Sequence, residues 1–168
     1  QAGQGTIALE MLDEVSNLDY IVVPVGGGGL ISGVASCAKQ INPDIKIIGV
    51  SAKGAPAMFE SFKDKCQHNS KSVRTIADGI AVRDASQITL SHILECVDEM
   101  VQVDDEEIAN AILYLLEQQK IMVEGAGAVS VAAILEGKFE FKKGAKIGAI
   151  LSGGNIDVQT LSIIIEKG

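Results

Sequence analysis

Short apolar runs alternate along the chain with segments that carry apolar residues at helical spacing. The apolar runs are rich in valine and isoleucine, the pattern of parallel strands that are buried on both faces. They predict four strands, at residues 20–25, 46–51, 100–103 and 146–151. The helically spaced segments predict helices at 6–15, 30–40, 56–63, 90–97, 104–120 and 127–135, and one more after residue 155.

The order of these elements predicts the fold class. Strands that alternate with helices form an α/β fold, here a three-layer sandwich around a mostly parallel sheet. The chain shows no internal repeat and no linker-like segment. Residues 1–168 are therefore expected to form a single domain.

Several helix ends carry recognisable signals. Thr6 is a candidate N-cap for the first helix, because its hydroxyl can accept a backbone N–H. Acidic residues at 104–107 occupy the first turn of the longest predicted helix, where they complement its dipole. Gly137 is placed to end the helix before it.

Composition and charge narrow the class of protein. The chain is 47% hydrophobic but only 4% aromatic, which favours an aliphatic core of the kind that parallel sheets use. The net charge of −8 disfavours nucleic acid or an anionic membrane as the main partner. No apolar run reaches the roughly 18 residues of a membrane span.

Cysteine and histidine usage disfavours metal and disulfide chemistry. The three cysteines form an odd set without C-x-x-C spacing, so neither a disulfide framework nor a zinc site is expected. His68 and His92 are isolated and are interpreted as surface or helix residues. A reducing, cytoplasmic location and a protein without a metal fit this pattern best.

The strongest motif is the tetraglycine segment, residues 26–29, which lies directly between a predicted strand and a predicted helix. Consecutive glycines let backbone N–H groups converge on one point, and the helix N-terminus adds a partial positive charge. A simple turn needs only one or two glycines, and further glycines cost chain entropy. We therefore interpret the segment as a phosphate cradle rather than a turn alone.

Two better-known phosphate motifs do not match. The glycine spacing departs from the G-x-G-x-x-G dinucleotide fingerprint, and Ser51 to Lys53 stand where an acidic ribose partner belongs. The lysine of a Walker A motif is missing as well.

A second glycine motif, the serine loop (residues 152–155), follows the last predicted strand. Because parallel strands share one carboxyl edge, it can line the same crevice as the tetraglycine segment.

Five motifs occur together in one order and carry a family resemblance over essentially the whole chain. They are Gln4-Gly5-Thr6, residues 26–30, Ala77-Asp78-Gly79, residues 124–128 and residues 152–155. The ordered set resembles the threonine dehydratase and serine racemase branch of the fold-type II enzymes that use pyridoxal 5′-phosphate (PLP). The resemblance implies the large domain of the tryptophan synthase β-like fold, and PLP as the cofactor.

The resemblance also implies cofactor-binding roles. Ser152 would hydrogen-bond the pyridine nitrogen; a hydroxyl there stabilises negative charge in the ring less than a carboxylate would, which favours prompt loss of a β-leaving group. The PLP phosphate would be held by the backbone amides of Gly26, Gly27, Gly28, Gly29 and Leu30.

Three further residues have weaker assignments. By the resemblance, Asp78 and Gly79 would lie on the substrate side of the ring, and Glu124 would lie near the cofactor. Each carboxylate also has a structural interpretation that stays open. Asp78 can be a turn residue before a glycine, and Glu124 can cap a helix.

No catalytic residue is expected in this chain. The enzymes it resembles hold PLP on a lysine between a serine and an arginine, in a part of the protein that precedes the region matched here. The segment Ser51-Ala52-Lys53 imitates that pattern but follows the second strand and lacks the arginine, so Lys53 is not expected to be the nucleophile. The chain is thus expected to be an incomplete part of a catalytic core, inactive alone.

The expected function of the complete protein is PLP-dependent deamination of L-threonine, and of L-serine, to 2-oxobutanoate or pyruvate and ammonia, in a dimer or tetramer. Biosynthetic and catabolic roles both remain open. Serine racemase or serine dehydratase is the alternative within the family, but the racemases carry a metal-binding acidic residue where this chain has Ser51. A phosphate- or nucleotide-binding domain without catalysis is the alternative from another class. The last alternative is a structural role, in which the glycines serve only as turns.

Overall fold

The computed structural model describes residues 2–168, and its sheet has four strands: β1 (Tyr20–Pro24), β2 (Lys46–Ala52), β3 (Glu99–Val103) and β4 (Ile147–Ala149). The α-helices are α1 (Gly5–Glu14), α2 (Gly29–Ile41), α3 (Ala57–Asp64), α4 (Gln87–Cys96), α5 (Asp105–Tyr114), α6 (Gly125–Leu135) and α7 (Val158–Lys167). Shorter helical segments are η1 (Ala2–Gln4), η2 (Asp78–Ile80) and the π-helical turn η3 (Leu115–Gln119).

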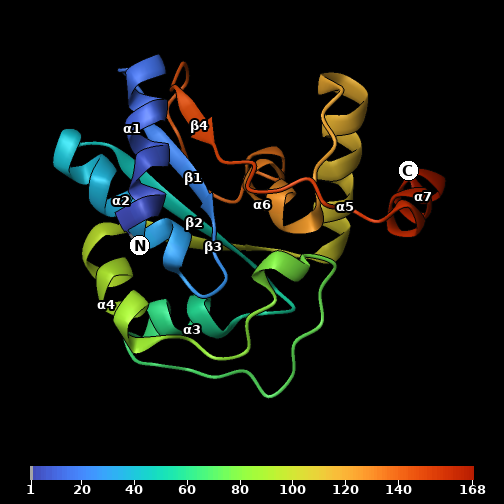
Figure 1. Cartoon of the computed structure of the whole chain (residues 1–168), viewed down its shortest axis with the longest axis horizontal. Coiled ribbons are helices and arrows are strands. Elements are labelled where there is room, and N and C mark those ends of the chain that lie inside the picture. Colours follow the sequence, from blue (N-terminus) through green and yellow to red (C-terminus); the bar gives the residue numbers. More distant parts are fainter. Residues whose placement is uncertain (1) are drawn as a thin grey trace.

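The sheet is parallel throughout, in the strand order β3-β2-β1-β4 (Figure 1). Val22 on β1 is paired with Ile48 on β2 on one side and with Ala149 on β4 on the other. All four carboxyl ends therefore share one edge. This confirms the predicted α/β class with a mostly parallel sheet.

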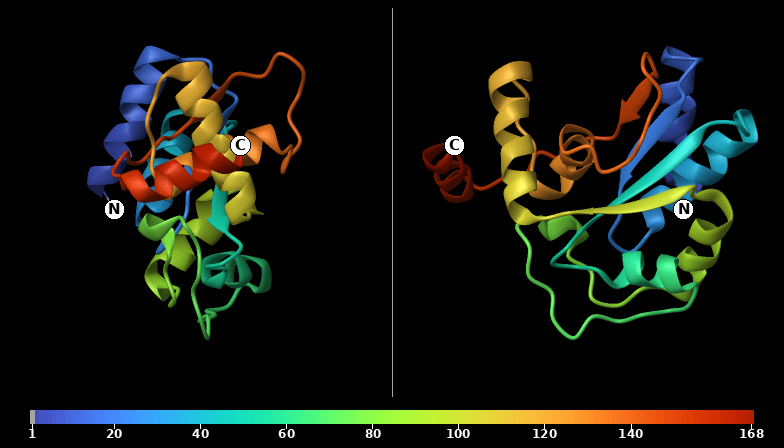
Figure 2. Two further views of the ribbon diagram at one scale, coloured as in Figure 1. Left: turned by 90° about the vertical axis from the view of Figure 1, so that its right-hand side faces the viewer. Right: turned by 180° about the vertical axis from the view of Figure 1, so that it is seen from behind.

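Helices cover both faces of the sheet (Figures 1 and 2). Residues at alternate positions of β1 enter different cores: Ile21 and Val23 pack with α1 to α4, and Val22 packs with α5 and α6. These side chains are fully buried, as is expected for a strand that is covered on both faces. The three-layer arrangement follows from this alternation.

The helix-end predictions have mixed outcomes. Asp104 and Glu107 form a reciprocal capping box at the start of α5, which accounts for the acidic first turn. The helix predicted at 104–120 is α5 continued by η3, and it ends at Lys120 in a left-handed conformation (φ 57°). Thr6 as N-cap was wrong: its hydroxyl donates to the carbonyl of Gly3 (3.0 Å), and α1 begins one residue earlier.

Other boundaries moved by a few residues. α4 begins at Gln87 rather than at 90 because Ser86 takes the extended N-cap conformation. α6 begins at Gly125 rather than at 127, and β4 is shorter than the strand predicted at 146–151. η2 was not among the predicted helices, because a single short turn has no periodicity to detect, although Asp78 at its start had an open interpretation as a turn residue.

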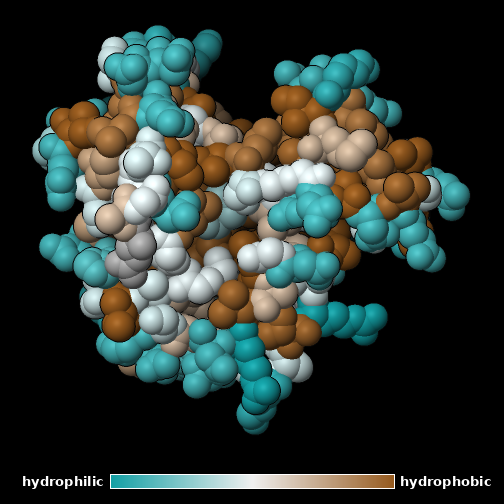
Figure 3. Space-filling view, viewed as in Figure 1, coloured by the Kyte–Doolittle hydropathy of each residue, from teal (hydrophilic) through white to brown (hydrophobic). Residues whose placement is uncertain are grey.

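Apolar residues gather over the C-terminal part of the molecule in Figure 3, where α7 leaves Val158, Ile163 and Ile165 exposed. α7 packs on α5 and lies at the side of the molecule, away from the sheet (Figure 1).

Across residues 2–168, no helix combines the length and the apolar character that crossing a membrane requires.

Candidate functional site

A pocket of about 280 Å³ lies at the carboxyl edge of the sheet, where β1 ends at Pro24. Its lining includes residues from four separate parts of the chain: the four glycines of the tetraglycine segment, Leu30, Gly79, Glu124 and Ser152. The edge that the sequence predicted as the meeting point of the two glycine motifs therefore does bring them together.

Gly28 gives the tetraglycine segment its shape. It occupies the N-cap position of α2 in a left-handed conformation, with φ 87° and ψ 3°. A Cβ atom on this residue would lie 2.7 Å from Cδ1 of Ile93 and 3.0 Å from Cβ of Thr89, both on α4. Only glycine fits here, because both the backbone conformation and the packing exclude a side chain.

Gly27 and Gly29, unlike Gly28, lie next to open space. A Cβ atom on either residue would meet no heavy atom within 4 Å. No side chain caps α2, and its first-turn N–H groups have no acceptors within the helix. Open space next to unpaired amides at a helix N-terminus is an arrangement suited to an anion such as a phosphate.

The unpredicted turn η2 forms a second wall of this pocket. A Cβ atom on Gly26 would lie 2.9 Å from Cα of Ile80, so the start of the tetraglycine segment packs directly against η2. This contact brings Gly79 to the pocket. Periodicity in the sequence carried no sign of it.

Ser152 enters the pocket from the serine loop. Ser152 is exposed. It lines both this pocket and an adjoining hollow of about 580 Å³, whose lining also includes Gln4, Leu30 and Leu151. Ser152 thus lines the same space as the four glycines. A ligand held by the amides at one end has a hydroxyl donor within the same pocket.

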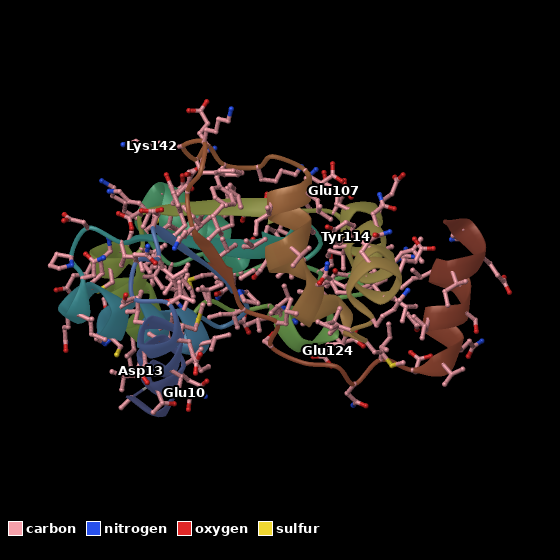
Figure 4. All side chains as sticks on the ribbon, turned by 90° about the horizontal axis from the view of Figure 1, so that it is seen from above. Glu10, Asp13, Glu107, Tyr114, Glu124 and Lys142 are labelled. Carbon is pink, nitrogen blue, oxygen red and sulfur yellow. The ribbon has the colours of Figure 1, made fainter. Side chains whose placement is uncertain are left out.

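Glu124 holds the serine loop by its backbone and by its side chain. Its N–H donates to the carbonyl of Gly153 (3.1 Å), and its carboxylate Oε2 accepts the N–H of Asn155 (3.2 Å). It stands at the N-cap position of α6 but makes no side-chain cap bond, so the helix-capping interpretation is not what the side chain does. Figure 4 shows Glu124 beside η2 and the chain that leads to α7.

Close backbone packing adds to this anchoring. A Cβ atom on Gly127, in the first turn of α6, would clash with the carbonyl oxygen of Gly153. A Cβ atom on Gly153 would in turn lie 2.5 Å from Oε1 of Glu124. The serine loop is therefore fixed against α6 by contacts that only glycines permit.

Asp78 is placed differently from the other candidate residues. It lines an adjacent pocket of about 180 Å³ together with Gly79, Glu124 and Asp157, and it is not in the lining of the pocket that holds the glycines. Gly79 and Glu124 line both pockets. They connect the tetraglycine pocket with the acidic space beside it.

Lys53 and Ser51 lie apart from this pocket. Lys53 is exposed, and its Nζ lies 3.4 Å from Oδ2 of Asp104. A hydrogen bond from the Glu107 N–H, assisted by Lys53, holds the pKa of Asp104 below its ordinary value. Ser51 is fully buried on β2. Within residues 2–168, no group of three or more His, Cys, Asp or Glu side chains is arranged to hold a metal ion.

Sequence reasoning missed Thr89. It lies on α4, far along the chain from the glycines, and its hydroxyl donates to the carbonyl of Gly27 (2.7 Å). A single threonine in an amphipathic helix gives no signal of such a contact, which only the packing of α4 against α2 creates.

Comparisons with known proteins show similarity over nearly the whole chain. The chain is 49% identical over 167 residues to an L-threonine ammonia-lyase of Thermotoga maritima, a match that covers 99% of this chain and 41% of the relative. It is 45% identical over 169 residues to a catabolic L-threonine dehydratase of Staphylococcus aureus, covering 99% of this chain and 49% of the relative. The chain thus spans between two fifths and half of the length of these relatives.

Solved structures of a serine racemase and a threonine deaminase are similar to this chain as well. Maize serine racemase superposes with a TM-score of 0.89 at 41% identity, covering 98% of this chain and 51% of that one. A processed threonine deaminase isoform from Solanum lycopersicum superposes with a TM-score of 0.89 at 36% identity, covering 98% and 48%. The family model described as pyridoxal-phosphate dependent enzyme matches residues 1–153, so the chain belongs to the family of enzymes that use PLP.

Proposed function

We propose that this chain is the cofactor-holding part of an enzyme that deaminates L-threonine, and more slowly L-serine, releasing 2-oxobutanoate or pyruvate and ammonia. The observation that carries the proposal is the meeting of the glycine amides and Ser152 in one pocket. The similarity to threonine ammonia-lyases and dehydratases supports the substrate class.

The residues present fit PLP at both of its ends. The open space next to Gly27 and Gly29 can take a phosphate group, because a Cβ atom there would meet nothing. Ser152 supplies a hydroxyl for the ring nitrogen in the same pocket. An aliphatic wall from Leu30 and Ile80 suits the face of an aromatic ring.

The phosphate end is bound without a basic side chain. Amides of the tetraglycine segment and of Leu30 would donate to phosphate oxygens, and the dipole of α2 would favour the negative charge there. Hydrogen bonds to a charged group are stronger than neutral ones, typically about 1.5–3 kcal/mol each. A few such bonds are enough to hold the cofactor in one orientation.

The ring end determines the chemistry. When bound, PLP provides the electron sink for the electrons released at the Cα atom of the amino acid. The Ser152 hydroxyl would donate to the ring nitrogen without adding a negative charge beside it. Glu124 holds the loop that carries this serine, and Asp78 and Gly79 are proposed to lie on the substrate side.

The remaining catalytic group is proposed to come from outside this chain. Lys53 is exposed and paired with Asp104 rather than placed in the pocket, so it is not assigned as the nucleophile. We propose that a lysine and a substrate-carboxylate loop are supplied by another part of the protein, and that the 168-residue chain alone does not deaminate threonine. A dimer or tetramer is proposed as the working assembly.

A 2-oxoacid assay tests the proposal. The gene product that contains this chain is expected to form 2-oxobutanoate from L-threonine in a PLP-dependent reaction, and the isolated chain is expected to form none. Formation of 2-oxobutanoate by the isolated chain above a blank would contradict the expectation that this chain alone is inactive. Lys53 would then again be a candidate nucleophile. Absence of 2-oxoacid from both preparations, together with phosphate binding, would favour a non-catalytic phosphate-binding domain.

Serine racemase is the second candidate, because maize serine racemase superposes as well as threonine deaminase does. The two candidates differ in their product from L-serine. Chiral analysis of the reaction with L-serine separates them: D-serine indicates racemisation, and pyruvate indicates elimination.

A further inference from the structure

We propose that Thr89 of α4 is a positioning residue that aims the Gly28 amide at the phosphate group. The proposal rests on the proposed function and adds to it a residue from an element outside the five sequence motifs. Its basis is the hydrogen bond from the Thr89 hydroxyl to the carbonyl of Gly27 (2.7 Å).

The Thr89 hydroxyl has two acceptors in reach and one proton to give. The carbonyl of Ser86 lies 3.1 Å from the hydroxyl and already accepts the N–H of Leu90 (2.9 Å). The Gly27 carbonyl is closer, at 2.7 Å. The proton therefore goes to Gly27, and the hydroxyl links α4 to the tetraglycine segment.

The position of this carbonyl fixes the direction of the next amide. The peptide bond between Gly27 and Gly28 is planar and trans, so its C=O and its N–H point in opposite directions. Holding the C=O toward α4 turns the N–H of Gly28 away from α4. The four glycines line the pocket. We infer that an amide turned away from α4 is directed toward that space.

Packing behind Gly28 reinforces the same orientation. Thr89 is only 9% exposed, and Ile93, one turn further along α4, is fully buried. A Cβ atom on Gly28 would lie 2.7 Å from Ile93 Cδ1 and 3.1 Å from Thr89 Oγ1, so the back of the segment is in full contact with α4. Without the hydroxyl, a glycine-rich segment has the backbone freedom to rotate this peptide.

Binding of pyridoxine 5′-phosphate tests the inference, since this probe has the ring and phosphate of PLP but no aldehyde to react with lysines. The full 168-residue chain is labelled with ¹⁵N, and the amide signals of residues 26–30 are followed during titration. Thr89→Val and Thr89→Ala remove the donor and are expected to weaken binding roughly tenfold, because one charge-assisted bond is misdirected. Thr89→Ser keeps the donor and is expected to bind within about twofold of the unmodified chain.

Thr6→Val is the matched control, because the Thr6 hydroxyl also donates to a glycine carbonyl, that of Gly3 (3.0 Å), but lies outside this pocket. It is expected to bind as the unmodified chain does. Thermal unfolding is measured for each variant to show that it folds. If Thr89→Val does not fold, the comparison of binding by Thr89→Ala and Thr89→Ser tests the role of the hydroxyl instead.

The outcomes separate this inference from the proposed function. If the unmodified chain binds the probe and Thr89→Val or Thr89→Ala binds equally well, the role of Thr89 is overturned and the phosphate site stands. If Thr89→Ser binds as weakly as Thr89→Ala, packing of the methyl group rather than the hydroxyl is responsible, and the inference is again overturned. If the probe leaves the amides of residues 26–30 of the unmodified chain unchanged, the proposed function itself fails.

Discussion

The carboxylate of Glu124 accepts the backbone N–H of Asn155 at 3.2 Å, and this bond joins the start of α6 to the serine loop. The N–H of Glu124 donates in the other direction, to the carbonyl of Gly153 (3.1 Å). Two bonds from one residue thus hold the loop at Gly153 and at Asn155, directly after Ser152. Glu124 acts on the pocket through that loop as well as by lining it.

Glu124→Ala is expected to loosen the serine loop, because the Asn155 amide loses its acceptor. Loss of about 1 kcal/mol corresponds to roughly fivefold faster exchange of that amide with solvent. Glu124→Gln retains a side-chain oxygen as acceptor and is expected to protect the amide largely as the original residue does. Hydrogen exchange followed by NMR measures both variants. Equal exchange in the Ala variant and the unmodified chain would show that the carboxylate does not hold the loop.

The tetraglycine segment shows how far the sequence could predict the site. Its position between a strand and a helix identified a phosphate cradle, and at that level the four glycines are equivalent. The structure separates them, because Gly28 contacts Ile93 and Thr89 whereas Gly29 faces open space. That difference depends on how α4 packs, more than fifty residues along the chain, and no local pattern records it.

Gly28→Ala is therefore expected to destabilise the fold, and Gly29→Ala is expected to leave it intact. At Gly28 the left-handed backbone and the contact with Ile93 together cost about 1–3 kcal/mol. At Gly29 an added methyl enters the space proposed for the phosphate, so binding of pyridoxine 5′-phosphate is expected to fall while thermal unfolding stays unchanged. Gly3→Ala, where a Cβ atom also meets nothing within 4 Å, is the matched control. A Gly28→Ala variant that unfolds at the original temperature would contradict this division.

Regular elements were predictable, and the short connecting elements were not. All four strands were located from their runs of apolar residues. Burial on both faces holds for β1, as Val22 and Val23 show, whereas β4 is only half-buried. η2 has three residues and no periodicity, yet Ile80 packs against Gly26 and so forms a wall of the pocket. The contacts of Glu124 with the serine loop likewise join residues about thirty positions apart.

Stability is expected to depend on pH through Asp98. Burial alone would raise the pKa of this carboxyl, but hydrogen bonds from Lys39 Nζ (2.7 Å) and from the N–H of Ile47 (2.8 Å) outweigh it, so the pKa lies below its ordinary value. A lowered pKa in the folded state contributes stability above the unfolded pKa of about 3.9, and this contribution is lost as the pH falls through the folded value.

Asp98→Asn is accordingly expected to be less stable than the original chain by about 1 kcal/mol at pH 7, because the ion pair with Lys39 is only partly shielded from water. Below pH 4 the difference is expected to shrink, since the Asp98 carboxyl then takes up a proton in the unfolded chain first and, as the pH falls further, in the folded chain as well. Urea unfolding of both proteins from pH 7 to pH 3 measures this. A difference that stays constant over that range would remove Asp98 as its cause.

Ser152 is the residue on which the proposed chemistry depends, and its exchange for Asp is expected to change the ring nitrogen rather than the phosphate contacts. A carboxylate within hydrogen-bonding distance raises the pKa of a basic nitrogen by about 1–3 units, because it stabilises the protonated form. The ring absorbance of bound pyridoxine 5′-phosphate, titrated with pH, is therefore expected to shift to higher pH in Ser152→Asp. Ser152→Ala is expected to weaken binding severalfold, by the roughly 0.5–1.5 kcal/mol of one neutral hydrogen bond, without that shift. Ser162→Asp places the same charge on the exposed surface of α7, outside the pocket, and controls for the change in net charge. If Ser152→Asp moves the titration no further than Ser162→Asp does, the Ser152 hydroxyl does not face the ring nitrogen and the proposed orientation of the cofactor is wrong.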